Sequence, residues 1–373
     1  MRALFDRIHR EGPVRFDVAV DALLYGDGGF FTSGGGAGRE GDFLTSPEVG
    51  PLFGTMLARA FDGEWERLGR PDPFVVIEAG AGRGTLARSI LDAEPACLRA
   101  LRYVCVERSA ALRLVIEEVL PVEPATNVFG AVVHGEDPDD EAAVVAGGGP
   151  VVTALDDLPL VPVTGMVVAN ELLDNLPFRL LERASDGWLE VLVGVDGDQL
   201  VEIPVRAPAD ASDEASRLAP DARAGARLPL QHEAVAWLRR SLATVQRGRV
   251  VAIDYADDTA ALAARPWAEW VRTYRGHGRG GHPLESPGQQ DVTCEVAVDQ
   301  LARVRRPDAD WTQGAWLAAH GIDGLVDAAR SAWDERAHIG DLEALRHRSR
   351  VNEAAALTDP TGLGAFRVLE WVV

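Results

Sequence analysis

The sequence predicts an α/β fold in which helices cover a mostly parallel, doubly wound sheet. From residue 74 onward, short apolar runs alternate with segments of helical periodicity. Strands that are separated by helices usually belong to one parallel sheet. Apolar residues make up 47% of the 373 residues, which is enough for a large core.

Two regions are expected along the chain. Residues 1–65 form an N-terminal segment of helices joined by a glycine-rich stretch, which we interpret as a lid. Residues 66–373 form the sheet domain, with insertions at about 183–230 and 256–295.

Five apolar runs are expected to form the parallel strands. In chain order they read FVVIEA, LRYVCVE, VVTALDDL, GMVVAN and GRVVAID. The first three end beside acidic or polar residues, as they would if a ligand lay across the carboxyl edge of the sheet. Alternation around Asp196-Gly197 predicts a hairpin, the glycine-rich residues 272–294 predict a long functional loop, and AFRVLEWVV predicts a closing strand.

The charge of the chain limits the classes of partner that it can bind. The chain has 37 basic residues, all of them arginine, against 58 acidic residues, and its net charge is −21. The absence of lysine excludes Schiff-base chemistry and a Walker lysine. The acidity argues against binding to nucleic acid or to an anionic membrane, and it permits a cationic substrate.

The sequence indicates a cytoplasmic protein without membrane insertion. The three cysteines show no CxxC spacing, which fits a reducing compartment. The first residues lack the apolar core of a signal peptide, and no apolar stretch reaches the 18 residues of a bilayer span. His277 and His282 have no further ligands at metal spacing, so no metal site is expected.

A glycine-rich loop after the first strand is the clearest candidate for a ligand site. Residues 78–85 read EAGAGRGT, and such glycines let a ligand approach the backbone at a helix N-terminus. The E-x-G-x-G-x-G pattern favours S-adenosylmethionine, but GRGTLA also fits the dinucleotide pattern G-x-G-x-x-(G/A), which leaves NAD open. Glu107 ends the next strand, where a carboxylate can accept both ribose hydroxyls of either cofactor.

Several blocks together resemble one family. They read GDFLTSPEVGPLFG, EAGAGRGTL, YVCVERSAALR, VVANELLDNLPFRLL, VVAIDYADD, SPGQQDVTCEV and TQGAWL. In this order they resemble the MidA family of S-adenosylmethionine-dependent methyltransferases. The resemblance implies a Rossmann-like class I methyltransferase sheet, S-adenosyl-L-methionine as the cofactor and, because mitochondrial members are linked to complex I assembly through arginine methylation, a protein substrate.

The resemblance and the strand ends together assign candidate site residues. The candidate cofactor residues are Thr45, Ser46, Glu78, Gly80, Gly82, Gly84, Thr85, Glu107, Asp156 and Asp157. The candidate substrate residues are Asp42, Glu48, Pro177 and Asp291.

Asn170, Glu171 and Asp174 are the candidate catalytic residues. They follow the fourth strand, and Glu171 and Asp174 share one face if the segment is helical. Two carboxylates there can hold a guanidinium and take up its proton as it is methylated. The alternative is a capped helix start with solvated acids.

The sequence therefore predicts methyl transfer to an arginine of a partner protein. Three other functions stay open: a methyltransferase acting on an oxygen or nitrogen of a small molecule, a cofactor-binding assembly factor without catalysis, and an NAD-dependent oxidoreductase. A shared fold does not choose between them.

Overall fold

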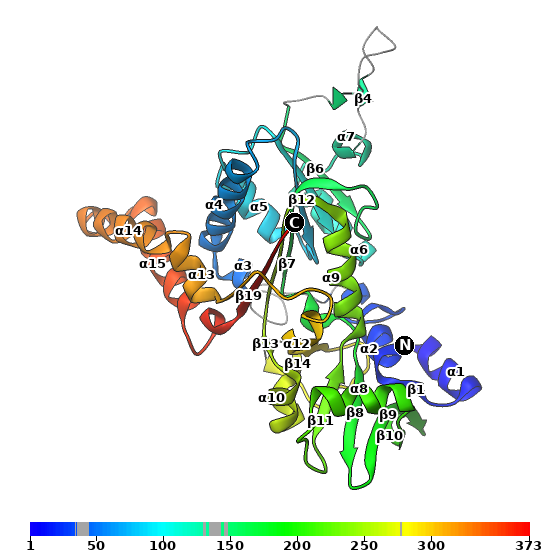
Figure 1. Cartoon of the computed structure of the whole chain (residues 1–373). Coiled ribbons are helices and arrows are strands. Elements are labelled where there is room, and N and C mark those ends of the chain that lie inside the picture. The colour runs from blue at the N-terminus through cyan, green and yellow to red at the C-terminus, as the bar shows by residue number, and fades with distance from the viewer. Residues whose placement is uncertain (34, 36–44, 130–131, 134–142, 145–147, 277) are drawn as a thin grey trace.

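A computed structural model describes residues 1–33, 35, 45–129, 132–133, 143–144, 148–276 and 278–373. A seven-stranded sheet of order β18-β19-β12-β7-β2-β3-β6 forms the centre of the molecule (Figure 1). Its strands are β2 (Phe74–Ala79), β3 (Leu101–Val106), β6 (Val151–Leu155), β7 (Val163–Asn170), β12 (Val245–Asp254), β18 (Ala309–Thr312) and β19 (Arg367–Val372).

The directions and order of the strands determine where a ligand crevice opens. β2, β3, β6, β7 and β12 run parallel, whereas β19 runs antiparallel to both β12 and β18. β2 lies between β3 and β7, so the strand order reverses there and a crevice opens at the carboxyl ends. The mostly parallel sheet expected from the sequence is confirmed, and so is the closing strand, β19.

Helices cover both faces of the sheet. Phe74 and Val76 face a core with α4 (Pro51–Arg67) and α5 (Thr85–Asp92), whereas Val75 and Ile77 face α9 (His232–Thr244). On the α4 side lie also α13 (Gln313–Ala319), α14 (Ile322–Arg336) and α15 (Leu342–Thr358), of which α14 and α15 project as a hairpin in Figure 1.

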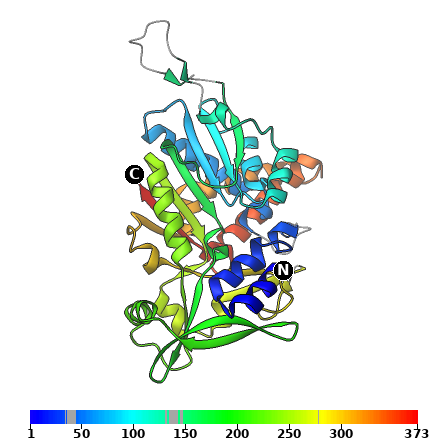
Figure 2. The same ribbon diagram turned by 90° about the vertical axis from the view of Figure 1, so that its right-hand side faces the viewer.

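A second sheet lies beyond the carboxyl edge of the first, next to the N-terminal helices (Figure 2). Its strands are β1 (Val14–Arg15), β8 (Arg179–Ala184), β9 (Gly187–Asp196), β10 (Gln199–Arg206) and β11 (Arg227–Leu230). α1 (Arg2–Glu11) and α2 (Phe16–Tyr25) pack on it through a shared core, and α8 (Ala209–Leu218) contacts β9. The predicted hairpin is confirmed as β9 and β10, which turn after Asp196.

The prediction of one long loop over residues 272–294 is wrong at both ends. β14 (Val271–Arg275) pairs with β16 (Asp291–Cys294) and with β15 (Gly278–Arg279). Val271, Thr273, Val292 and Cys294 are buried, and this apolar content holds the strands although glycine and proline dominate between them.

The remaining short elements connect these parts. They are η1 (Phe31–Ser33), α3 (Ser46–Val49), α6 (Ala110–Val119), α7 (Thr126–Phe129), β4 (Val132–Val133), β5 (Ala143–Val144), η2 (Leu173–Asn175), β13 (Ala256–Asp257), α10 (Thr259–Ala264), α11 (Trp267–Trp270), β17 (Val296–Ala297), α12 (Val298–Leu301) and η3 (Leu363–Ala365).

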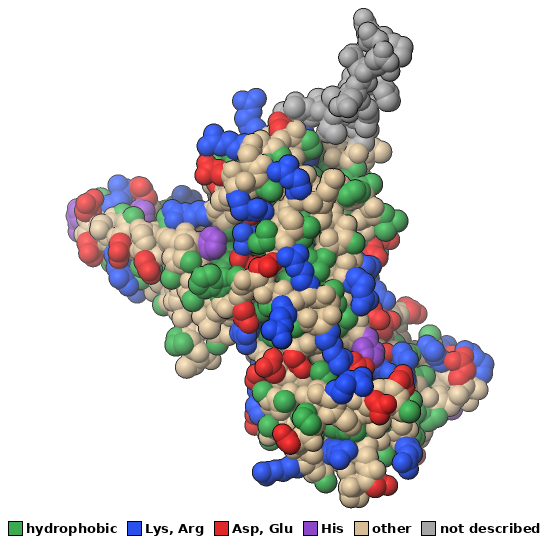
Figure 3. Space-filling model, viewed as in Figure 1, with side chains coloured by type: hydrophobic (Ala, Val, Ile, Leu, Met, Phe, Trp, Pro, Cys, Tyr) green, Lys and Arg blue, Asp and Glu red, His purple; other side chains and the backbone are tan. Residues whose placement is uncertain are grey.

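The surface shown in Figure 3 mixes arginine and carboxylate side chains over most of its described area. Every helix among the described residues falls short of the length and apolarity that a bilayer crossing requires.

Candidate active site

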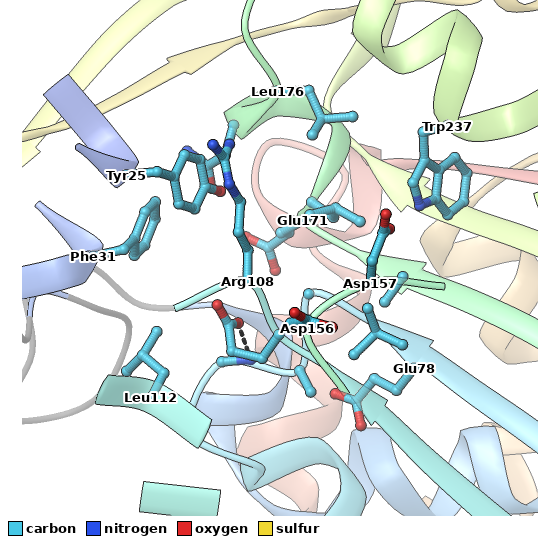
Figure 4. A pocket seen from close by; sticks show the side chains of 18 of the residues that line it. Tyr25, Phe31, Glu78, Arg108, Leu112, Asp156, Asp157, Glu171, Leu176 and Trp237 are labelled. Carbon is cyan, nitrogen blue, oxygen red and sulfur yellow. Dashed lines mark hydrogen bonds between the residues drawn. The ribbon is translucent and has the colours of Figure 1, made fainter. Parts of the chain in front are cut away.

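A cavity of about 790 Å³ lies at the carboxyl ends of β2, β3, β6 and β7, where they face the N-terminal helices (Figure 4). Twelve of the residues predicted from the sequence line it: Thr45, Glu48, Glu78, Gly80, Gly82, Thr85, Glu107, Asp156, Asp157, Asn170, Glu171 and Pro177. Ser46, Gly84, Asp174 and Asp291 are not part of the wall. Asp42 lies outside the described residues.

The glycine loop forms the floor of this cavity. Gly80, Gly82 and Gly84 adopt φ angles of 75°, 54° and 78°, a region that favours glycine. A Cβ on Gly82 would meet nothing within 4 Å, so the backbone there faces open space. Glu78 is buried below the loop, where it accepts a hydrogen bond from the Tyr103 hydroxyl at 2.7 Å and where burial raises its pKa to about 8.

Glu107 is fixed by the backbone around it. Its Oε2 accepts from the Gly82 N–H at 2.9 Å, and its Oε1 accepts from the Ser109 N–H at 2.7 Å. Each oxygen keeps a further lone pair for a ligand hydroxyl. Burial raises the pKa of Glu107, while the two N–H groups lower it.

The wall near β6 is acidic. Asp157 accepts from Arg240 of α9 at 2.7 Å and caps the Leu158 N–H at 2.8 Å, so its carboxylate already has partners within the chain. Asp156 lines the cavity beside it.

Several lining residues were not identified from the sequence, among them Tyr25, Phe31, Arg108 and Trp237. The Tyr25 and Phe31 rings stack with centroids 5.3 Å apart, and the Arg108 guanidinium lies 4.5 Å from the Tyr25 centroid. Figure 4 shows these three side chains together on one side of the cavity, with Trp237 on the other. Of these four residues, only Arg108 could have been identified from the sequence, since it directly follows Glu107.

Glu171 occupies the corner where β7 ends. Its φ is 51°, unusual for a residue other than glycine and typical of functional sites, and its N–H donates to the Ile253 carbonyl at 2.8 Å. Its Oε1 accepts from the Ser46 N–H at 3.0 Å and from Asn170 Nδ2 at 3.2 Å.

The condition under which Glu171 and Asp174 would share a helical face is not met. Glu171 is left-handed, and only the short turn η2 follows it. The cause is Asp254, whose carboxylate accepts from the Leu173 N–H at 2.9 Å and from the Asp174 N–H at 3.2 Å. This pairing begins the short turn η2.

Two buried carboxylates, Asp174 and Asp254, therefore lie close to half-buried Glu171 at this corner. Burial raises the pKa of Glu171 to about 8 and that of Asp174 to about 7. The pKa of Asp254 rises well above its ordinary value because of burial and the nearby Asp174 and Glu171. Such a group is stabilised by an added cation.

The residues present fit a nucleoside cofactor. The cavity volume lies within the range of small-molecule sites. Glu107 offers acceptors for ribose hydroxyls, and the open backbone at Gly82 permits close approach. Within the described chain, the buried Trp237 Nε1–H and Asn170 Oδ1 have no hydrogen-bond partner, which is expected where a ligand completes the wall.

A parallel sheet with one antiparallel strand before its edge, a glycine loop after the first strand and a buried acid after the second define the class I methyltransferase fold. The chain belongs to the family described as "Putative S-adenosyl-L-methionine-dependent methyltransferase", whose profile matches residues 56–314. The resemblance to the MidA family is thereby confirmed.

Known relatives agree with this assignment. The mouse protein named protein arginine methyltransferase NDUFAF7, mitochondrial, is 27% identical, and the match covers 95% of this chain and 82% of the mouse protein. The Drosophila melanogaster homolog is also 27% identical, over 78% of this chain and 66% of its own length. A Burkholderia thailandensis protein described as a "likely methyl transferase", solved with bound S-adenosyl-homocysteine, is 26% identical with a TM-score of 0.80, and the match covers 100% of this chain and 91% of that one.

These findings confirm two predictions from the sequence. The cofactor is S-adenosyl-L-methionine, and the protein is an S-adenosylmethionine-dependent methyltransferase. The glycine loop therefore belongs to a site for S-adenosylmethionine and not for NAD. The protein is an enzyme and not an assembly factor without catalysis.

Proposed function

We propose that this methyltransferase transfers the methyl group to an arginine side chain of a partner protein. The observation that carries the proposal is a group of three carboxylates where β7 meets the cofactor cavity: half-buried Glu171 in the cavity wall, with buried Asp174 and Asp254 behind it. A guanidinium is the cation that pairs best with carboxylates, because its planar N–H groups form paired hydrogen bonds. The names of the relatives from mouse and fly support the same substrate.

S-adenosylmethionine supplies an electrophilic methyl group when it is bound. Glu171 lies in the cavity wall, where it can hold the guanidinium and orient one nitrogen. That nitrogen loses a proton as it is methylated, and Glu171 accepts it. With a pKa of about 8, the carboxylate is suited to exchange a proton near neutral pH.

Asp174 and Asp254 support this step from behind the wall. Asp254 holds the backbone of η2 through two N–H groups, which fixes the turn after Glu171. The charge of Asp174 adds to the attraction for a cation, and its Oδ1 has no hydrogen-bond partner within the described residues.

The charged residues of the cavity lining support a polypeptide substrate. They include Arg7 of α1, Arg15 of β1, Asp17 of α2 and Glu233 of α9. Such side chains offer hydrogen-bond partners to the backbone and side chains around a target arginine.

The experiment that tests the proposal is methyl labelling. The purified protein is incubated with S-adenosylmethionine carrying a labelled methyl group and with proteins from its own cells, and acid hydrolysates are analysed for methylarginine by mass spectrometry. We expect methylarginine with the wild type and with Glu66→Gln, which changes an exposed carboxylate on α4. We expect none with Glu171→Gln. Label on a small molecule or on another amino acid would contradict the proposal.

A further inference from the structure

We propose that Gln313 is a positioning residue for Glu171, which it holds through Ser46. The proposal rests on the proposed function, because it assigns Glu171 the role of proton acceptor. It assigns a role to the block TQGAWL, which is distant in the sequence from the residues of the cavity wall.

Ser46 connects the two residues by separate atoms. Its backbone N–H donates to Glu171 Oε1 at 3.0 Å, and its hydroxyl donates to Gln313 Oε1 at 3.2 Å. Ser46 and Gln313 are each 0% exposed, so water does not compete for the bond between their side chains. The hydroxyl of Ser46 is therefore engaged away from the cavity, and its backbone serves the site.

The orientation of the Gln313 amide is fixed. Its Nε2 donates to the Leu357 carbonyl at 3.0 Å, and its backbone N–H donates to the Phe366 carbonyl at 2.7 Å. A rotated amide would place its oxygen against the Leu357 carbonyl, which cannot donate. Gln313 therefore presents an acceptor to Ser46, and the hydroxyl of Ser46 is held in one direction.

A second contact anchors the other end of α3. Glu353 of α15 accepts from the Leu52 N–H at 3.0 Å, at the start of α4, where a carboxylate also complements the helix dipole. A Cβ on Gly50 would lie 2.3 Å from the Glu353 carboxyl carbon, so the carboxylate packs directly on this junction. The C-terminal helices thus fix α3 from both sides.

These contacts matter because α3 has little stability of its own. It has four residues and no side-chain cap, and a single helical turn in isolation is unstable. Tertiary contacts must therefore set the position of the Ser46 N–H. This N–H lowers the pKa of Glu171, against the effect of burial, so its displacement has a measurable consequence.

Displacement of the Ser46 N–H raises the pKa of Glu171. Loss of the Gln313 contact weakens the hydrogen bond to ionised Glu171, and the pKa of Glu171 rises further. The acid limb of the rate profile, below which Glu171 is protonated, then moves to higher pH. The titratable groups that face Glu171 are Asp174, Asp254 and Tyr255, and they are present in every variant compared.

Gln313→Met and Ser46→Ala test the proposal with two readouts. The first is hydrogen exchange at the Ser46 amide in the enzyme saturated with S-adenosylhomocysteine, which needs no substrate. The second is the pH profile of kcat for arginine methylation. Gln300→Met is the matched control, because Gln300 is equally buried and bonds Gln231 N–H and the Pro229 carbonyl elsewhere.

We expect faster exchange at Ser46 in Gln313→Met, an acid limb at higher pH, a fall in kcat on the order of 10-fold to 100-fold and an unchanged KM for S-adenosylmethionine. Ser46→Ala keeps the N–H but loses the tie to Gln313, so it should show the same changes even if Gln313→Met fails to fold. The control should show none of them.

Unchanged exchange at Ser46 in both variants would overturn the proposal, as would a loss of kcat without a shift of the pH profile. Failure of the proposed function is a different result. In that case the wild type methylates no arginine, while the exchange at Ser46 still reports whether Gln313 holds this segment.

Discussion

Two carboxylates at the cavity, buried Glu107 and half-buried Glu171, differ in what surrounds them. Both oxygens of Glu107 accept a backbone N–H, whereas Glu171 receives one backbone N–H and one amide and lies near two further carboxylates. Such different surroundings give two residues of the same type different roles. Glu107 is arranged to stay in place and accept hydroxyl groups, and Glu171 is arranged to gain and lose a proton.

Glu107→Gln should weaken cofactor binding. The substitution replaces one acceptor by an NH₂ group that faces a backbone N–H, and it removes the charge from the ribose contact. A hydrogen bond to a charged group is worth about 1.5–3 kcal/mol, so we expect Kd for S-adenosylhomocysteine to rise roughly 10-fold to 100-fold. Calorimetric titration measures this, and Glu66→Gln should bind like the wild type. Equal affinity of Glu107→Gln would exclude a ribose contact.

Glu171→Gln should stabilise the fold increasingly as pH rises. The pKa of Glu171 is about 8 in the folded protein against an ordinary 4.5. A raised pKa gives a contribution that is fully present below pH 4.5 and is lost as pH rises through 8. Between pH 6 and pH 9 the variant should therefore gain roughly 2.5 kcal/mol over the wild type in denaturant unfolding. A difference that does not change with pH would show that Glu171 is ionised without cost.

At the level of elements, the three central strands approach closely at two glycines. A Cβ on Gly165 of β7 would lie 1.8 Å from the Val75 carbonyl oxygen of β2, and one on Gly248 of β12 would lie 1.7 Å from the Gly165 oxygen. Their φ angles are 152° and 145°, which other residues rarely adopt. The strands that carry Glu171 and the glycine loop are aligned at this point.

Gly165→Ala should therefore destabilise the protein strongly. Overpacking and backbone strain together should lower the free energy of unfolding by about 3 kcal/mol or more. Gly63→Ala is the matched control, because Gly63 is exposed within α4 and a Cβ there meets nothing within 4 Å. It should gain about 1 kcal/mol from helix propensity. Similar effects of the two substitutions would contradict the account of the strand contacts.

The sequence predicted the elements whose residues carry a local pattern. The apolar runs identified β2, β3, β6, β7 and β12, and the alternation around Asp196-Gly197 identified β9 and β10. The conformation after Asn170 was not predictable, because Asp254, on another strand, sets it. The pairing of β14 with β16 depends in the same way on residues brought together only by folding.

For the whole molecule, the cavity lies between the main sheet and the N-terminal helices. Arg108 Nη1 donates to Asp21 of α2 at 2.6 Å, and the Ser109 hydroxyl donates to the Phe31 carbonyl at 2.9 Å. The motifs on the sheet side could be identified from the sequence. The residues opposite them, such as Tyr25 and Trp237, follow no spacing relative to those motifs, and only the three-dimensional structure brings them to the wall.

The division of the chain at residue 65 and the cytoplasmic location stay predictions. The curated relatives carry the description mitochondrial in their names, which concerns those proteins.

The proposed function requires that Glu171 at the end of β7, with Asp174 and Asp254 behind it, binds a guanidinium beside the cofactor. Its most direct test is calorimetric titration of the enzyme, saturated with S-adenosylhomocysteine, with an arginine peptide and its citrulline counterpart, in two buffers of different ionisation enthalpy at pH 7. We predict that only the arginine peptide binds and that protons are released, because the cation lowers the pKa of Glu171 and Asp174. Equal binding of both peptides, or binding without proton release, would contradict the account.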